Sequence, residues 1–390
     1  MPILAALLLW CVLGLRGLSA ALTDGRQWWL IGLGLLTFWA LLSPSWARFG
    51  TQSGEAAAQF LVVVTFALML TAVDFPPRYA AYAFGTGLIV QGLIVILQMH
   101  LQGSVGVWGL GEFNLYPTRR DLSVVVADGI RLIRPYGLQA HPNIAGGYLA
   151  IGLLVLAGGV FTEVRGKLPM IGAAVLSLGF WAMLLTFSRG AWLSFAIGLL
   201  TLAILTWHAR LWRRESLQRA LAVLLIMSGI GLLFVVGYGS FLLARAGINS
   251  GETEQISVAQ RGVFMGIAHD LILRHPTGGT GIGTFAWEAA DMLRRLPYRG
   301  LRGENVHNVP LLITSELGVL GLLGWLLMHI TWVAYIWRKV RDPYALGLAA
   351  AAVALLVIGL VDHYPFGMYH GLIMSFGCMA AACYPASRHV

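Results

Sequence analysis

The sequence contains very little charge. Only 11% of its 390 residues are Asp, Glu, Lys or Arg, whereas 58% are hydrophobic and the mean hydropathy is +0.76. A soluble domain carries about 25% charged residues, so this chain has too little polar surface to stay dissolved in water. The composition therefore excludes an ordinary soluble domain and predicts an all-α polytopic membrane protein.

Cysteine is scarce, and the usual metal and nucleophile motifs are missing. Cys11, Cys378 and Cys383 all fall in apolar segments without metal-ligand spacing, so we expect them to be packing residues. The loops that we expect to be external contain no Asp-x-Asp pair and no His, Asp or Glu group with ligand spacing, and no Gly-x-Ser-x-Gly occurs. These absences disfavour a metal-dependent phosphate site and a nucleophile elbow, and we expect no cofactor.

Long apolar runs make up most of the chain. At roughly 20 residues per crossing, hydropathy predicts about eleven membrane spans. The first span is the weakest, because Arg16 interrupts it. The predicted spans cover residues 3–22, 27–43, 57–73, 79–101, 144–161, 168–187, 190–208, 220–243, 309–336, 344–361 and 370–385.

The basic residues are scattered between these runs, which is not the pattern of a nucleic-acid-binding surface. The short basic segments 208–219 and 338–343 predict cytoplasmic loops. Counting spans from them places Ser188–Arg189 and the loops 102–143, 244–308 and 362–369 on the external side. We expect one membrane-embedded domain over residues 1–390, whose two long external loops carry several arginines. An anionic substrate would explain such a cationic external surface.

The loop 244–308 has two recognisable parts. Its first part predicts an amphipathic helix at the membrane surface or over the bundle, which begins at a capping-box pattern of Ser257 and Gln260. The apolar residues at helical spacing are Val263, Phe264, Ile267, Leu271 and Ile272. The second part, GGTGIGTF (278–285), has no preceding strand. We therefore interpret it as a tight loop whose backbone approaches another element, not as a nucleotide site.

Two arginines are candidates for anion binding. Arg189 lies between two spans with almost no loop, where a charge is expensive and is a functional candidate by default. The alternative is an arginine that reaches from a span end to water. Arg261 falls in the expected first turns of the loop helix, where its guanidinium and the helix N-terminal amides could hold a phosphate oxygen. The alternative there is a solvated charge on the polar face.

His307 precedes Pro310, a pattern that is typical of the first turn of a helix. It therefore lies at the N-terminal mouth of a span, where the helix dipole favours a neutral imidazole that could act as a base. A hydrogen-bonded structural histidine is the alternative. At about 100° per residue, Glu316 falls on the opposite helix face from His307. We expect Glu304, or a distant carboxylate such as Asp362, to orient the imidazole instead.

Further polar residues occupy the same external side. His141 and Asn143 flank Pro142 at the start of a span, where capping of the helix is the alternative to a substrate contact. The segment 361–371 adds Asp362, His363 and His370 as weaker candidates. The polar residues that we expect to contact substrate are His141, Asn143, Arg302, Glu304 and Asn308.

Four segments occur together in the order found in the O-antigen ligase-like family, which the chain resembles over about residues 130–335. They are GLQAHPNIAGGYLA (137–150), FSRGAW (187–192), QRGVFMGIAHDLILRHPTGGTGIGTF (260–285) and ENVHNVPLLITSELGVLGLLGWLL (304–327). The family transfers a glycan from an undecaprenyl-diphosphate carrier to an acceptor on the periplasmic face, without metal or nucleotide. It also includes O-antigen polymerases and protein O-oligosaccharyltransferases.

The resemblance implies roles for three residues: Arg189 and Arg261 hold the diphosphate, and His307 is the essential histidine. It further implies a GT-C-like fold, a multi-pass location in the inner membrane and an active site on the periplasmic face. The implied partners are the undecaprenyl-diphosphate-linked donor, a glycan or lipid A-core acceptor, and membrane lipids. A polysaccharide polymerase has the same chemistry and stays open as an alternative. A transporter of lipid-linked glycans and a scaffolding protein are the alternatives outside enzymes.

Overall fold

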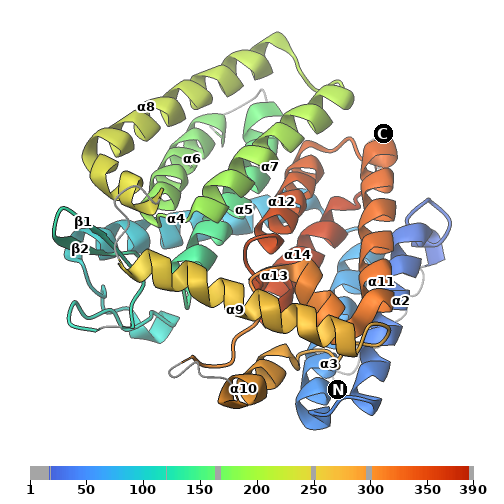
Figure 1. Cartoon of the computed structure of the whole chain (residues 1–390). Coiled ribbons are helices and arrows are strands. Elements are labelled where there is room, and N and C mark those ends of the chain that lie inside the picture. The colour runs from blue at the N-terminus through green and yellow to red at the C-terminus, as the bar shows by residue number, and fades with distance from the viewer. Residues whose placement is uncertain are drawn as a thin grey trace. The chain divides into compact units, whose positions relative to one another are not determined.

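The computed structural model describes residues 17, 19–119, 121–162, 168–246, 252–295 and 301–385. Helices dominate it (Figure 1), and seven helices among the described residues are long and apolar enough to cross a membrane. The prediction of an all-α polytopic membrane protein is confirmed. These seven helices are α2 (Gln27–Leu42, extended by the 3-10 turn η1, Ser43–Ser45), α3 (Gly50–Ala72), α4 (Pro77–Leu101), α5 (Pro142–Thr162), α7 (Arg189–His208), α8 (Arg214–Arg245) and α11 (Val309–Lys339).

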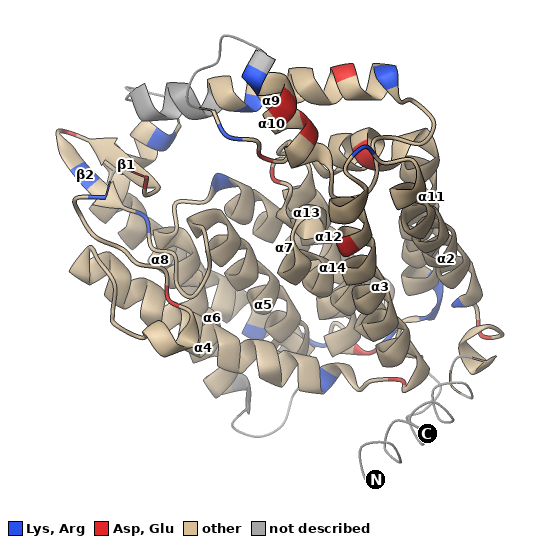
Figure 2. Ribbon diagram, turned by 90° about the horizontal axis from the view of Figure 1, so that it is seen from below, with Lys and Arg blue, Asp and Glu red and all other residues tan. Residues whose placement is uncertain are grey.

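Three predicted spans correspond to shorter helices. They are α6 (Leu168–Leu185), α12 (Pro343–Gly359) and α14 (Tyr369–Ala382). Most of the predicted span 3–22 falls outside the described residues. Helix α3 begins at Gly50, seven residues before the predicted span, because its first turns are polar and hydropathy does not detect them. Charged residues lie mostly in loops, at helix ends and on α9 (Glu252–Arg274) and α10 (Phe285–Arg295), as Figure 2 shows.

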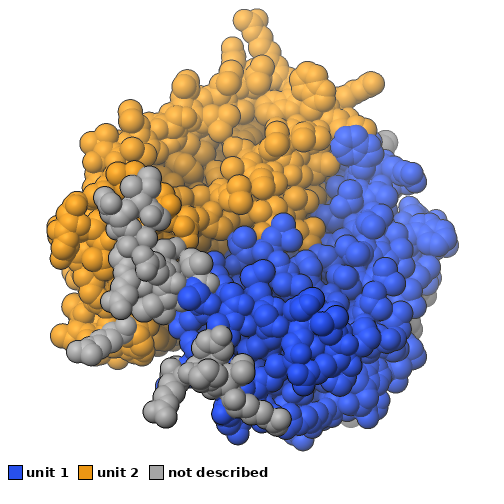
Figure 3. Space-filling view, viewed as in Figure 1, with its two compact units in different colours: residues 1–77, 259–342, 359–390 blue, residues 78–258, 343–358 orange. Residues whose placement is uncertain are grey.

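Two compact units interleave along the chain (Figure 3). Unit 1 comprises Met1–Pro77, Ala259–Asp342 and Gly359–Val390, and unit 2 comprises Arg78–Val258 and Pro343–Ile358. In unit 1, α2 packs along α11, and α3 packs on α14. The first pair is very close, since a Cβ added to Gly32 would lie 2.7 Å from the Met328 backbone. Such small residues let two membrane helices approach and gain van der Waals contact.

A buried arginine ties α2 to the end of α3 in unit 1. Arg26 is 2% exposed, and its Nη1 lies 2.7 Å from Asp74 Oδ1. The same guanidinium donates to Asp24 and to the carbonyl of Thr71. A buried guanidinium is tolerated only when it is paired and hydrogen-bonded in this way, so the cluster fixes the entry of α2 relative to α3.

Helix α5 forms the centre of unit 2. It contacts α6, α7 and α8, and nearly all of its side chains are buried. The loop that follows α4 is an ordered part of the same unit. Glu112 accepts hydrogen bonds from three consecutive backbone N–H groups of Val105, Gly106 and Val107. Within this loop, Leu115, Leu122, Ile133 and Tyr136 form a small core.

This loop also contains a β-hairpin, which the sequence analysis did not predict. Strands β1 (Val124–Ala127) and β2 (Ile130–Ile133) pair antiparallel, with Ala127 opposite Ile130. The turn residues Asp128 and Gly129 both have positive φ, 51° and 75°. An Asp-Gly pair between apolar runs is the strongest short-range hairpin signal, because both turn positions need positive φ. The sequence therefore contains a local signal for this hairpin.

The predicted helix of the second long loop is confirmed as α9, but its predicted start is wrong. Helix α9 begins at Glu252, so Ser257 lies inside it and the capping box at Ser257 and Gln260 does not mark the helix start. The apolar stripe begins only at Val263, so the pattern could not reveal the polar turns before it. The stripe itself is buried: Phe264, Ile267 and Leu271 are each less than 5% exposed.

Candidate functional site

His307 lies immediately before α11, as the sequence predicts. Asn308 is the N-cap of that helix, and its side-chain oxygen accepts a hydrogen bond of 2.9 Å from the backbone N–H of Leu311. Pro310 occupies the first turn, where its missing N–H costs nothing. The neighbouring Val306 and Val309 are buried and anchor the segment. The Asn308 cap and the two buried valines therefore fix the backbone that carries His307 at the entrance of the helix.

A second segment of unit 1 is bound to this entrance. The Asn308 side-chain amide donates a hydrogen bond of 3.0 Å to the carbonyl of Leu360, just after the end of α12. This contact brings Asp362 and His363 to His307. The rings of His307 and His363 lie edge to face, with centroids 5.3 Å apart. One candidate ligand atom from each of His307, Asp362 and His363 lies within 4.8 Å of the others.

The surroundings of His307 favour a neutral imidazole. Burial lowers the pKa of His307 below its ordinary value, and the positive charge of Arg261 acts in the same direction. The negative charges of Asp362 and Glu304 oppose this shift in the pKa, but they do not cancel it. The ring is thus a proton acceptor at neutral pH, with carboxylates near it that stabilise the imidazolium formed when it accepts a proton.

Asp362, and not Glu316, lies beside His307 in the structure. Asp362 is 8% exposed and belongs to the histidine cluster, whereas Glu316 binds elsewhere. The exclusion of Glu316 on helical geometry is therefore consistent with the structure. His363, which was only a weak candidate in the sequence, joins the same cluster. Burial lowers the pKa of its imidazole to about 4.

Arg261 faces the His307 region from α9. It influences the charge state of His307 electrostatically, and its side chain is half-buried. Since α9 begins at Glu252, Arg261 lies in the third turn and not in the first. The prediction that the N-terminal amides of that helix bind a phosphate oxygen together with Arg261 is therefore wrong. An anion at this position would be bound by the Arg261 guanidinium without those amides.

Glu316 holds the glycine-rich loop against α11. Its carboxylate accepts hydrogen bonds from the backbone N–H groups of Gly283 (2.9 Å) and Phe285 (3.0 Å). Helix α11 is broken next to it at Gly318, where φ is 66° and ψ is −170°. The freed N–H of Val319 donates to the carbonyl of Pro276. The prediction that GGTGIGTF approaches another element is confirmed, because Gly279 leaves no room for a Cβ beside the Glu316 backbone.

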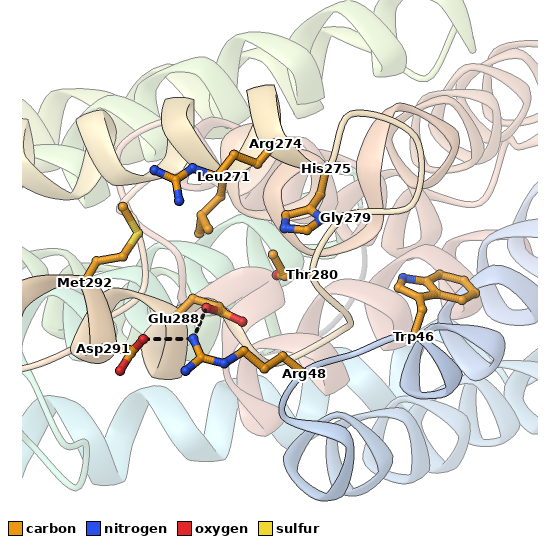
Figure 4. A pocket seen from close by; sticks show the side chains of 10 residues that line it. All are labelled: Trp46, Arg48, Leu271, Arg274, His275, Gly279, Thr280, Glu288, Asp291 and Met292. Atoms are coloured by element: carbon orange, nitrogen blue, oxygen red, sulfur yellow. Dashed lines mark hydrogen bonds and ion pairs between the residues drawn. The ribbon is translucent and has the colours of Figure 1, made fainter.

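A pocket of about 220 Å³ opens beside α10 in unit 1 (Figure 4). Arg48 points at two carboxylates of α10, with its Nη1 2.8 Å from Asp291 Oδ2 and 3.4 Å from Glu288 Oε2. Because this arginine is paired, the pocket is better suited to neutral hydroxyl groups than to a diphosphate. The lining residues are Trp46, Arg48, Leu271, Arg274, His275, Gly279, Thr280, Glu288, Asp291 and Met292.

Arg189 belongs to unit 2, where it is the first residue of α7. Its side chain is exposed, and its guanidinium donates to the backbone carbonyl of Arg245. Ser188 is the N-cap and accepts from the N–H of Ala191. Phe187, just before it, adopts a positive φ of 50° and is fully buried. A bulky residue rarely adopts this conformation, so the buried aromatic contacts of Phe187 fix the turn that presents Arg189.

His141 and Asn143 lie at the start of α5 in unit 2. The His141 Nδ1 accepts a hydrogen bond of 3.1 Å from the N–H of Asn143, so the ring caps the helix. The Asn143 side-chain oxygen accepts from the buried Arg134, which also donates to the Thr186 carbonyl. These contacts are structural, and a contact with substrate stays a prediction for both residues.

The other residues that we expect to contact substrate, Arg302, Glu304 and Asn308, lie close to His307 in the sequence. Asn308 uses its side-chain oxygen and its amide in structural hydrogen bonds. Arg302 and Glu304 are exposed on the segment that leads to His307. A Cβ added to the intervening Gly303 would lie 2.2 Å from the Ala286 carbonyl, so this segment runs closely along α10.

Comparison with known proteins supports the predicted resemblance. Residues 172–326 match the family model described as O-Antigen ligase. The matched region contains Arg189, Arg261 and His307, whereas His141, Asn143, Asp362 and His363 lie outside it. The match therefore supports the resemblance over the middle of the chain, where three of the four resembling segments lie. The chain has no significant match among the curated proteins.

Proposed function

We propose that this multi-pass membrane protein is an inverting glycosyltransferase that acts without a metal. It would move a glycan from an undecaprenyl-diphosphate carrier to an acceptor hydroxyl on the periplasmic face of the inner membrane. The observation that carries this proposal is the setting of His307: a neutral imidazole beside Asp362, within electrostatic range of Arg261. The O-Antigen ligase match supports the same chemistry.

The reaction requires removal of one proton and stabilisation of one leaving group. The acceptor oxygen attacks the anomeric carbon, and the bond from that carbon to the diphosphate oxygen breaks. The acceptor proton passes to His307, and the bonding electrons leave with the diphosphate. Attack opposite the leaving group inverts the anomeric centre. Diphosphate is already a good leaving group, so no carboxylic acid is needed to protonate it.

The arginines supply the positive charge that this step needs. A guanidinium stabilises the charge that develops on phosphate oxygens, with two hydrogen bonds in a fixed geometry. Arg261 is the candidate in unit 1, on the evidence of its effect on His307. The resemblance assigns the same ligand to Arg189. An exposed guanidinium at the N-terminus of α7 is consistent with anion binding.

The test is glycan transfer by purified protein in detergent, with a lipid-linked oligosaccharide as donor. Lipid A-core, a protein and a second lipid-linked unit would be offered in turn as acceptors. We expect transfer by the unmodified chain and its loss in Arg189→Ala, Arg261→Ala and His307→Ala variants that elute as folded monodisperse protein. Normal transfer by all three variants would contradict the proposed site.

The acceptor that is used separates the two enzyme hypotheses. Transfer to lipid A-core indicates a ligase, and transfer to a second lipid-linked unit indicates a polymerase. Both use the same donor and the same base, so the site residues serve either reaction. A lipid-linked glycan transporter is the less favoured alternative, and it would show no transfer to any acceptor.

A further inference from the structure

Two imidazole nitrogens in the His307 cluster are buried without a hydrogen bond. They are the Nδ1 atoms of His307 and His363, for which no partner exists among the described residues. Buried polar atoms are hydrogen-bonded in the large majority of cases, so an unsatisfied one calls for an explanation, such as an ion. Here the two unsatisfied nitrogens belong to neighbouring rings, whose centroids are 5.3 Å apart, and the Asp362 carboxylate lies beside both rings.

The geometry of the cluster is close to that of a metal site. One ligand atom from each of His307, Asp362 and His363 lies within 4.8 Å of the other two. Around one zinc ion, nitrogen and oxygen ligands at about 2.0–2.2 Å lie roughly 3.5 Å from one another. The three atoms, at separations of up to 4.8 Å, would have to draw closer together to share a single coordination shell. A water molecule would complete a tetrahedral set, as it does in zinc sites with three protein ligands.

Backbone hydrogen bonds and a close glycine hold Asp362 and His363 in place. The His363 N–H donates 2.8 Å to Asp362 Oδ1, which fixes the carboxylate against its neighbour. The His363 carbonyl accepts from the N–H of Gly367 at 2.7 Å. A Cβ added to Gly367 would lie 2.9 Å from His363 Nδ1, so glycine leaves the space that this ring occupies. The second histidine is thus placed by the short helix α13 (Tyr364–Gly367).

We propose that His307, Asp362 and His363 bind a divalent transition-metal ion of the zinc class, and that the bound ion inhibits glycan transfer. Two imidazoles and one carboxylate favour Zn²⁺ or Co²⁺ over Mg²⁺ or Ca²⁺, which prefer oxygen ligands. The inhibition clause rests on the proposed function. A nitrogen of His307 that coordinates a metal has no lone pair left to accept the acceptor proton.

The binding experiment uses the full chain in detergent, purified without a polyhistidine tag and treated with a chelator. Co²⁺ titration followed by visible absorption, and Zn²⁺ titration followed by calorimetry, should each show one ion per chain. We expect His363→Ala to weaken binding by at least about tenfold. The exposed His275 is the matched control, and His275→Ala should bind as the unmodified chain does. Absence of binding, or equal binding by His363→Ala, would overturn the site.

Asp362→Asn provides a second variant if His363→Ala elutes as aggregated protein. It keeps the size of the side chain and removes the charge, and it should weaken Zn²⁺ binding in the same direction. Unchanged binding by a folded Asp362→Asn protein would equally overturn the proposed coordination.

Activity measurements test the inhibition separately. Zn²⁺ should reduce glycan transfer by the unmodified chain, and a chelator should restore it. In His363→Ala, at least about ten times more Zn²⁺ should be needed for the same fractional inhibition. Binding of one ion without inhibition would overturn the inhibition clause. If no transfer occurs at all, the proposed function and this clause both fail, while the titrations still decide the metal site.

Discussion

The Glu316 carboxylate accepts a hydrogen bond of 2.9 Å from the backbone N–H of Gly283, so α11 holds the glycine-rich loop through a buried side chain. Glu316 is 2% exposed, and its second oxygen accepts from the N–H of Phe285 at the start of α10. A carboxylate at a helix N-terminus is favoured by the unpaired N–H groups and by the helix dipole. Glu316 therefore fixes the beginning of α10, along which the chain returns to His307.

Replacement of Glu316 should destabilise unit 1. Glu316→Ala leaves the N–H groups of Gly283 and Phe285 without an acceptor, which costs about 1–3 kcal/mol for each buried group. Glu316→Gln keeps one acceptor oxygen and should cost less. The measurement is the apparent melting temperature in detergent, with the exposed Glu55→Gln as control. Equal melting of Glu316→Ala and the unmodified chain would contradict this role.

The break at Gly318 should tolerate only glycine. With φ at 66° and ψ at −170°, the residue is in a region that other residues rarely adopt, and an added Cβ would lie 2.1 Å from the Thr277 carbonyl oxygen. We expect Gly318→Ala to lose at least about 1–3 kcal/mol from backbone strain alone. Gly324→Ala on the same helix is the control, because its nearest contact would be an ordinary 3.5 Å. Size-exclusion profiles after heating would compare the two, and similar profiles would refute the constraint.

Replacement of the proposed base, His307, and replacement of the neighbouring Asp362 should have different kinetic effects. His307→Ala removes the proton acceptor and should reduce transfer by about 10²–10⁴-fold, the usual contribution of a general base. Asp362→Asn keeps the shape of the side chain, so it should lower kcat by a smaller factor and leave KM for the donor nearly unchanged. Initial rates over a range of donor concentrations would measure both. A change confined to KM would assign Asp362 to substrate binding instead.

The position of His307 was predictable because its determinants are local. Asn308 and Pro310 mark a helix start within three residues, and hydropathy marks the span that follows. The partner of His307 was not predictable to the same degree. Asp362 and His363 reach it only through the turn after α12 and the hydrogen bond from Asn308 to Leu360. The pattern of apolar and polar residues in a single sequence does not reveal a contact between two segments that lie so far apart along the chain.

The errors at α9 and at the hairpin have different causes. The true start of α9 lies in polar residues before the apolar stripe, and hydrophobic periodicity is silent there. Asp128 and Gly129 signal the hairpin, but its strands are only four residues long each, which is too short for a clear alternation of apolar and polar residues. Glu316 is a third case, because helical geometry excluded one partner without revealing the loop amides that it binds.

Glu112 should make the long loop after α4 sensitive to acid. Burial alone would raise the pKa of Glu112, but hydrogen bonds from Gln98 and from the backbone N–H groups of Val105, Gly106 and Val107 outweigh this effect, and the pKa lies below its ordinary value. A carboxyl group with a lowered folded-state pKa stabilises the fold above its unfolded-state pKa, about 4.3 for Glu. This stabilisation is lost as the pH falls from there through the folded-state pKa.

Limited proteolysis of the loop from pH 7 to below pH 4 would measure this loss of stability. The protease should tolerate acid, and its amount should be adjusted so that its own activity is equal at each pH. The unmodified loop should be resistant at neutral pH and should become more susceptible as Glu112 is protonated. Glu112→Gln should be more susceptible at neutral pH and should change less on acidification, because it has no charge to lose. Glu55→Gln, which alters an exposed carboxyl group, should retain the pH dependence of the unmodified chain. If Glu112→Gln instead showed the full acid response, a different carboxyl group would be responsible for it.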